Sequence, residues 1–249
     1  MIRLASVLRP VELTDQVAHE LTERFKSDRS QRVWNQPFIK TALLEMSSWK
    51  CCFCECKLAD EGTDPEVEHF HPKALYPDEV LVWENLLPIC SPCNRTKRDH
   101  DTQTEPIIHP AKDDPRDHLR LDSLCWFKGK TELGKTTLRA IRNLNDPQRA
   151  CKKRWEVSAQ LKKELERLED EVREFLAGVN TRQKQSRILH AMRQIMQTGQ
   201  SSERYAATVA TEILREDSYH FVKTELAALG LWDADFQQLE DGLMRIAFL

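Results

Sequence analysis

The sequence predicts an α+β protein that is mostly helical, with a zinc-stapled core between an N-terminal and a C-terminal helical region. Only 7 glycines occur among 249 residues, and Glu, Lys, Arg, Leu and Ala are frequent, which favours helix over sheet. Two cysteine pairs, Cys51 with Cys54 and Cys90 with Cys93, have the C-x-x-C spacing that suits two corners each of a tetrahedral zinc site. Proline and β-branched residues increase around these pairs, which indicates short strands.

The first hundred residues form two segments. Residues 1–48 have apolar residues at helical spacing, which predicts two helices with Pro37 at the start of the second. Residues 49–101 contain both cysteine pairs and are expected to form short strands that end in a helix. This second segment is the expected core.

The rest of the chain also forms two segments. Residues 102–148 are expected to form short strands separated by turns, which are indicated by Asp114-Pro115, Lys128-Gly129 and Gly134. Residues 149–249 return to helical spacing. This C-terminal helical region does nothing obvious for a reaction at the core, so we expect it to dock a partner.

Charge and composition limit the function. A formal net charge of −3 gives little general attraction to nucleic acid, so any contact must use a local basic patch or a partner. The start of the chain lacks the longer apolar stretch of a signal peptide, and no apolar run approaches membrane-spanning length. Eight cysteines without a secretory signal are expected to be thiols and metal ligands. We therefore expect a cytoplasmic protein without a membrane partner.

The four paired cysteines are the expected ligands of a structural zinc ion. Cys52 and Cys56 offer other pairings, but only Cys51 and Cys54 reproduce the interval of the second pair. The 35 residues between Cys54 and Cys90 exceed the spacer of an ordinary zinc ribbon, so this loop is expected to have structure of its own. A zinc staple that only holds a binding module is the alternative that the spacing leaves open.

Residues between and after the cysteine pairs have the chemistry of a metal-dependent nuclease. A neutral imidazole at His69 is suited to activating a water molecule, and Glu68 and Asn94 offer the oxygen ligands that Mg²⁺ prefers. Adjacent strand residues point to opposite faces, so Glu68 and His69 reach one site only if the strand bends or ends there, as Pro72 allows. Asn85 is expected to orient the His69 ring or to tie the loop by backbone hydrogen bonds, and a simple turn residue fits its chemistry equally well.

A short helix is predicted directly after the second cysteine pair. Ser91 is the expected N-cap and Pro92 suits the first helical position. Cations on this helix would line a path for phosphates. The expected nucleic-acid contacts are His71, Lys73, Arg95, Lys97 and Arg98.

These residues resemble a known family. Glu68-His69, Asn85 and Asn94, set between the two C-x-x-C pairs, are similar to the HNH endonucleases, which have a ββα-metal core. Further motifs resemble the PtuB-like HNH subunits of Septu antiphage systems, which also occur as retron-associated effectors. The motifs lie in roughly the first 150 residues, at 1–2, 33–34, 51–55, 67–73, 83–87, 90–97, 113–115 and 144–145.

The resemblance implies a function and a role for each residue. It implies a bacterial defence endonuclease that hydrolyses phosphodiester bonds in nucleic acid, with DNA favoured. By resemblance, His69 is the general base with Asn85 as a second catalytic residue, Glu68 and Asn94 hold a catalytic Mg²⁺ or Mn²⁺, and the four cysteines hold Zn²⁺.

The resemblance also implies partners and leaves alternatives. The expected partner is a PtuA-like ATPase of the ABC/SMC type, through which a retron reverse transcriptase and its msDNA could also associate. A ribonuclease of the same chemistry, which would cut RNA such as tRNA, is one alternative. A zinc-stapled adaptor without catalysis is the other.

Overall fold

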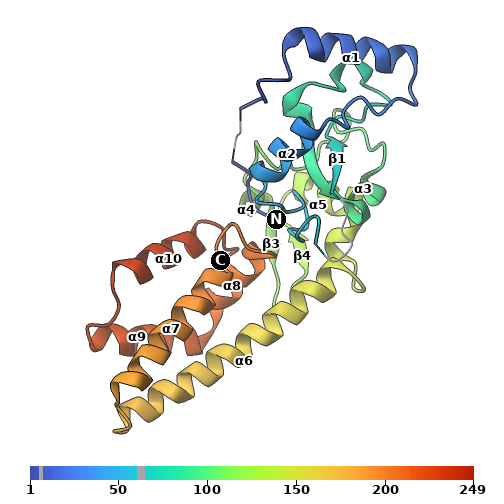
Figure 1. Ribbon diagram of the computed structural model, residues 1–249. Helices are drawn as coiled ribbons and strands as arrows, with labels where there is room; N and C mark the ends of the chain where they lie inside the picture. Colours follow the sequence, from blue (N-terminus) through green and yellow to red (C-terminus); the bar gives the residue numbers. More distant parts are fainter. Residues whose placement is uncertain (6–7, 61–64) are drawn as a thin grey trace. The chain divides into compact units, whose positions relative to one another are not determined.

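The computed structural model in Figure 1 describes residues 1–5, 8–60 and 65–249. The described chain is mostly helical and has two small two-stranded sheets, so the expected α+β class is confirmed at this level. It divides into two compact units. The first contains Met1–Leu119 and Phe127–Ala150, and the second contains Arg120–Trp126 and Cys151–Leu249.

The first unit begins with two helices that share a core with a sheet. Helix α1 spans Asp15–Ser27 and is capped by Thr14, whose hydroxyl accepts from the backbone N–H of Val17. Helix α2 spans Pro37–Met46 and starts at the proline that the sequence places there. Apolar side chains of both helices pack against β1 and β2 in one buried cluster, which includes Phe25, Ile39, Leu43, Val67, Trp83 and Leu86.

The centre of this unit is a hairpin followed by a helix. Strands β1 (Pro65–His69) and β2 (Leu86–Cys90) pair in antiparallel register, with His69 opposite Leu86. The connection between them contains the short 3₁₀ helices η1 (Pro77–Glu79) and η2 (Trp83–Asn85). Helix α3 (Ser91–Lys97) follows β2 without a loop. The predicted cap is wrong by one residue, because Ser91 is already helical and Cys90 is the N-cap.

The last part of this unit adds short elements. These are α4 (Pro115–His118), β4 (Phe127–Gly129), α5 (Glu132–Ala140) and η3 (Arg142–Asn145). Strand β3 (Leu119–Leu121) begins at the last residue of the unit's first segment and belongs mostly to the second unit. The turns predicted at Lys128-Gly129 and at Gly134 are wrong, since Lys128 and Gly129 lie in β4 and Gly134 lies inside α5. A Cβ atom there would lie 2.1 Å from the carbonyl oxygen of His118, so the missing side chain permits a close approach of backbones.

The second unit is helical, as the spacing of its apolar residues predicts. Its helices are α6 (Ala150–Leu176), α7 (Arg182–Thr198), α8 (Ala206–Arg215), α9 (Asp217–Ala228) and α10 (Ala234–Met244). They enclose one apolar cluster that includes Leu165, Met192, Ile213, Tyr219 and Phe236. Within the described ranges, no helix combines the length and apolar character needed to cross a bilayer.

Candidate functional site

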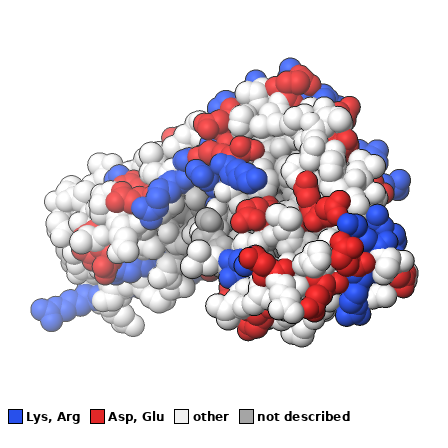
Figure 2. Space-filling view, turned by 90° about the horizontal axis from the view of Figure 1, so that it is seen from above, with Lys and Arg blue, Asp and Glu red and all other residues white. Residues whose placement is uncertain are grey.

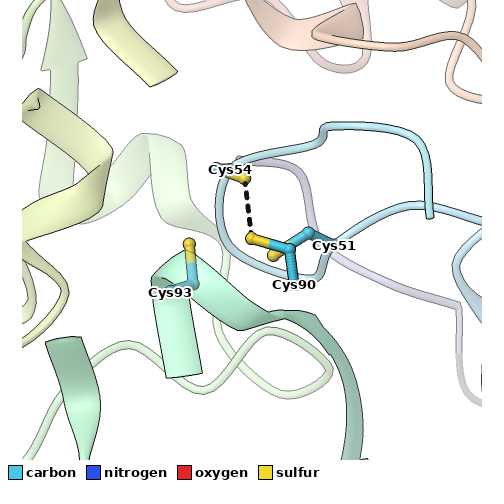
Figure 3. A group of neighbouring side chains, drawn as sticks. All are labelled: Cys51, Cys54, Cys90 and Cys93. Carbon is cyan, nitrogen blue, oxygen red and sulfur yellow. Dashed lines mark hydrogen bonds between the residues drawn. The ribbon is translucent and has the colours of Figure 1, made fainter. Parts of the chain in front are cut away.

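Four cysteine side chains meet in the first unit (Figure 3). Cys51 and Cys54 precede β1, Cys90 ends β2 and Cys93 lies in the first turn of α3. All four are buried, and their sulfur atoms lie within 4.8 Å of one another, with 3.6 Å between those of Cys54 and Cys90. A tetrahedral zinc ion with Zn–S bonds of about 2.3 Å requires sulfur atoms about 3.8 Å apart. The group therefore fits a zinc ion.

The loop that carries the first pair is held by backbone bonds. Cys52 donates its N–H to the carbonyl of Pro88 in β2, and Cys51 donates to the carbonyl of Cys56, both at 2.9 Å. Glu55 has a positive φ of 64°, which lets the chain turn sharply after Cys54. The thiol of Cys56 is half-buried and close enough to the thiols of Cys51, Cys54 and Cys90 for them to raise its pKa.

Asn143 in η3 supports this cluster from another part of the chain. Its Nδ2 atom donates to the sulfur of Cys93 at 3.1 Å, and the whole residue is buried. Its Oδ1 atom is buried without a hydrogen-bond partner in the described structure, which costs about 1–3 kcal/mol. Such a cost indicates that the amide is placed for the sulfur, since a donor to a thiolate stabilises and orients a metal ligand. The sequence around Asn143 does not predict this contact, because Cys93 lies 50 residues earlier in the chain.

A second site lies in a cavity of about 150 Å³ beside β1 and α3. It brings together Glu68, His69 and Asn94, the three residues expected to carry the chemistry. Strand β1 ends at His69, so the alternation of side chains between the two faces of a strand stops there and both Glu68 and His69 can line the cavity. The remaining lining residues are Val67, Pro72, Lys73, Arg98 and Asp99.

The protonation state of His69 follows from its hydrogen bond. Its Nε2 atom lies 3.0 Å from the carbonyl oxygen of Val80, which can only accept, so Nε2 carries the proton. In the neutral ring Nδ1 is then the basic nitrogen. Burial, followed by the positive charge of Lys73, lowers the pKa of His69 to about 3, so the ring is neutral at pH 7. Trp34 packs edge-on against it, with ring centroids 4.8 Å apart.

Glu68 forms a buried ion pair with Lys97. Glu68 Oε1 lies 2.5 Å from Lys97 Nζ without good hydrogen-bond geometry, and Lys97 also donates to the carbonyl of His69 at 3.1 Å. Burial raises the pKa of Glu68 even though Lys97 opposes the shift. The expectation that Lys97 contacts nucleic acid is therefore corrected: its side chain is buried because this face of α3 packs on β1.

The side chains of Glu68 and Asn94 fit a divalent cation. Asn94 Nδ2 donates to Glu66, which leaves the carbonyl oxygen of the amide as the atom that can act as a ligand. A carboxylate oxygen accepts more than one bond, so Glu68 can pair with Lys97 and also bind a cation. Apart from the four cysteines, no group of three or more His, Cys, Asp or Glu lies this close within the described residues. Two protein ligands suit Mg²⁺, which usually keeps several waters.

Asn85 binds backbone groups and not the His69 ring. Its Oδ1 atom accepts from the N–H of His71 at 2.7 Å, and its Nδ2 atom donates to the carbonyls of His71 and Glu79. Its own carbonyl accepts from the N–H of Phe70, the residue after His69. Asn85 therefore holds the loop between β1 and β2 together through backbone hydrogen bonds. Any effect of Asn85 on catalysis would come from the position that it gives to His69.

The other residues expected to contact nucleic acid differ in burial and in position. His71 is half-buried with Nδ1 2.8 Å from the Thr102 hydroxyl. Lys73 and Arg98 line the cavity, whereas Arg95 is exposed on α3 outside this lining. The hydroxyl of Thr102 donates to the carbonyl of Phe70, so it accepts from a protonated Nδ1 of His71.

Two bacterial Septu proteins are similar to this chain. A Septu protein PtuB from Bacillus thuringiensis is 37% identical over 240 residues, which cover 96% of this chain and 92% of the relative. The chain belongs to the Septu PtuB family. A second Septu protein PtuB, from Bacillus mycoides strain KBAB4, is 25% identical over 133 residues, 41% of this chain and 45% of the relative. No protein-family model matches the chain, and no solved structure matches it.

The contact from Asn143 to Cys93 leads to a prediction about metal affinity. Asn143→Ala should weaken zinc binding by about 10- to 100-fold, because the sulfur loses a donor that stabilises its thiolate form. Competition with a chromophoric chelator measures this affinity. Asn145→Ala is the matched control, since Asn145 lies in the same 3₁₀ helix but binds only the backbone of Phe127. Equal zinc affinity in both variants would show that the Asn143 contact is only packing.

Proposed function

We propose that this protein is a metal-dependent HNH endonuclease of bacterial antiphage defence that hydrolyses phosphodiester bonds, with DNA as the favoured substrate. The observation that carries the proposal is the single cavity lined by Glu68, His69 and Asn94, formed by a strand–strand–helix unit with four clustered cysteines. Membership of the Septu PtuB family supports the role in defence. The residues in the cavity match those that the HNH resemblance assigns to catalysis.

His69 is the proposed general base. Nε2 is held by the Val80 carbonyl, so Nδ1 is the atom that accepts a proton from the attacking water. Trp34 and the buried surroundings fix the plane of the His69 ring. Asn85 binds the backbone of His71 and of Glu79, the residue before Val80. These contacts leave the imidazole one tautomer and one orientation.

Glu68 and Asn94 are the proposed ligands of Mg²⁺ or Mn²⁺. A bound cation would stabilise negative charge on the phosphate and on the departing oxygen. Lys97 keeps the buried Glu68 carboxylate in place on the β1 side, and Asn94 presents its amide from the first turn of α3. The cysteine cluster would hold a closed structural zinc, which contributes folding energy and takes no part in the reaction.

We further propose that the chain works with a PtuA-like ATPase. The name of its relatives, Septu protein PtuB, supports a place in a Septu system. The residues proposed for catalysis all lie in the first unit, so the helices of the second unit are available for docking. The ATPase would make the activity depend on its bound nucleotide and would strengthen binding to nucleic acid. A retron reverse transcriptase with its msDNA could join the complex through the ATPase.

One assay tests the proposed activity. The zinc-loaded chain, alone and together with the ATPase, is incubated with plasmid DNA and with total RNA in the presence of Mg²⁺. Cleavage of DNA supports the proposal, whereas cleavage of RNA alone would make the protein a ribonuclease. Absence of cleavage of either substrate, in both preparations, would indicate an adaptor.

His69→Ala is expected to reduce cleavage by about 10²- to 10⁴-fold, because the general base is lost. Zinc content and partner binding should stay at the parental level. Initial rates with labelled DNA measure the effect. His100→Ala is the control, since His100 is a nearby histidine whose ring binds Glu105 and does not line the cavity. A His69→Ala rate close to the parental rate would move the base to His71.

Asn94→Ala is expected to raise the Mg²⁺ concentration needed for half-maximal cleavage, because one of two oxygen ligands is lost. Rates measured over a Mg²⁺ titration show the shift. Arg95→Ala, at the next position on the exposed side of α3, is the control. Asn94 is preferred to Glu68 for this test, since removing Glu68 leaves Lys97 buried without its partner and costs about 3–5 kcal/mol. An unchanged Mg²⁺ requirement in Asn94→Ala would exclude Asn94 as a ligand.

Docking through the second unit predicts a pattern of amide protection. In the complex with the ATPase, hydrogen exchange should slow in surface segments of α6 to α10, because docking excludes water from the helices that it covers. Mass spectrometry of the free and the bound full-length chain measures this. Protection confined to α1, α2 and the hairpin would place the docking surface in the first unit and contradict the proposal.

A further inference from the structure

A larger cavity of about 460 Å³ adjoins the one that contains His69. The two cavities share Val67, Lys73 and Asn94 in their linings. The additional walls come from the segment between α1 and α2 and from α2 itself. These walls contribute Arg29, Ser30, Arg32, Trp34, Asn35 and Lys40.

The charge of this cavity is strongly positive. Arg29, Arg32, Lys40 and Lys73 all line it, and Glu66 is the only carboxylate among the described residues of its wall. Glu66 is engaged with the amide of Asn94, next to the smaller cavity. Among the described residues, none of the four cations forms an ion pair with a carboxylate, whereas Lys26 in α1 pairs with both Glu23 and Asp78.

The positions of these cations are partly fixed in advance. The guanidinium of Arg29 lies 4.9 Å from the centroid of the Phe25 ring, and its Nη1 atom donates to the carbonyl of Lys73 at 3.5 Å. The ammonium of Lys73 lies 4.9 Å from the centroid of the Trp34 ring. Trp34 also packs against His69, so one aromatic side chain positions both a cation of the larger cavity and the proposed base.

On the face shown in Figure 2, Lys and Arg side chains are interspersed with Asp and Glu and do not form one continuous basic surface. The chain as a whole has a net charge of −3. Four cations without carboxylate partners in one cavity are therefore a local feature that bulk composition does not explain.

We propose that this cavity binds the phosphate backbone of the DNA strand next to the phosphate that is cleaved. The inference rests on the proposed function and deepens it by assigning Arg29, Arg32 and Lys40, with Lys73, as phosphate contacts. Shared lining residues make the cavity continuous with the site of hydrolysis. Its lining contains four cations, one of which, Lys73, lies over the ring of Trp34. Recognition here is independent of base sequence.

The test is a measurement of binding without added Mg²⁺, so that the result does not depend on cleavage. Fluorescence anisotropy with full-length protein gives the affinity for a labelled DNA of fixed length over a range of salt from about 50 to 200 mM. Arg32→Gln and Lys40→Gln should each weaken binding to every sequence. Each should also lower the slope of log affinity against log salt by about 0.9 for duplex DNA, or about 0.7 for a single strand.

Lys163→Gln is the control with the same change in net charge. Lys163 is exposed on α6 in the second unit, so its loss should leave the slope unchanged. Zinc content and thermal unfolding of each variant verify that the fold is intact. Slopes for Arg32→Gln and Lys40→Gln equal to that of Lys163→Gln would overturn the inference.

The same variants separate this inference from the proposed function. A parallel titration with RNA of equal length identifies the strand, and a change of slope confined to RNA would overturn the assignment to DNA. Normal DNA cleavage with unchanged slopes would refute only the binding cavity. Reduced slopes in a protein that cleaves neither DNA nor RNA would retain the binding cavity and refute the nuclease.

Discussion

The main constraint on this structure is that a sheet of two five-residue strands is at best marginally stable alone. Its register is held from outside, by the apolar cluster under α1 and α2 and by the cysteines that join the loop before β1, the end of β2 and the start of α3. Glu68 and His69 lie in β1 and Asn94 lies in α3, so the proposed site depends on this arrangement. Loss of the cysteine cluster would therefore disperse the site as well as unfold the core.

The buried pair of Lys97 and Glu68 links the fold to the chemistry. Lys97 binds the Glu68 carboxylate and the carbonyl of His69, so α3 is fixed against the last two residues of β1. Two charges buried together are costly unless both are paired, and such pairs are weak evidence for stability. Here the pair fixes the distance between Asn94 on α3 and Glu68 and His69 on β1. Its contribution is to the geometry of the cavity.

Residue spacing predicted the parts of the site that are close in sequence. The cysteine intervals identified a group that comes together, and Glu68, His69 and Asn94 line one cavity. Lys97 was misjudged because a residue seven positions along a short helix can face either solvent or core, and only packing on β1 decides. Val80, Asn143 and Trp34 act across the fold, through contacts that no local pattern encodes. Arg32 lies between α1 and α2 and Lys40 lies in α2, both outside the segment that the sequence predicts as the core.

The distribution of charge connects these observations. A protein with excess negative charge is repelled by nucleic acid at long range, and the repulsion is screened beyond about 8–10 Å at physiological salt. Cations without carboxylate partners beside the proposed catalytic site would then act only after close approach, on the strand that the proposed nuclease cuts. We expect a chain with this net charge to bind nucleic acid weakly in general, and its encounter with a target would then depend on another component. Such dependence is what we expect of a nuclease restrained by a partner, since indiscriminate cutting would harm the cell that makes it.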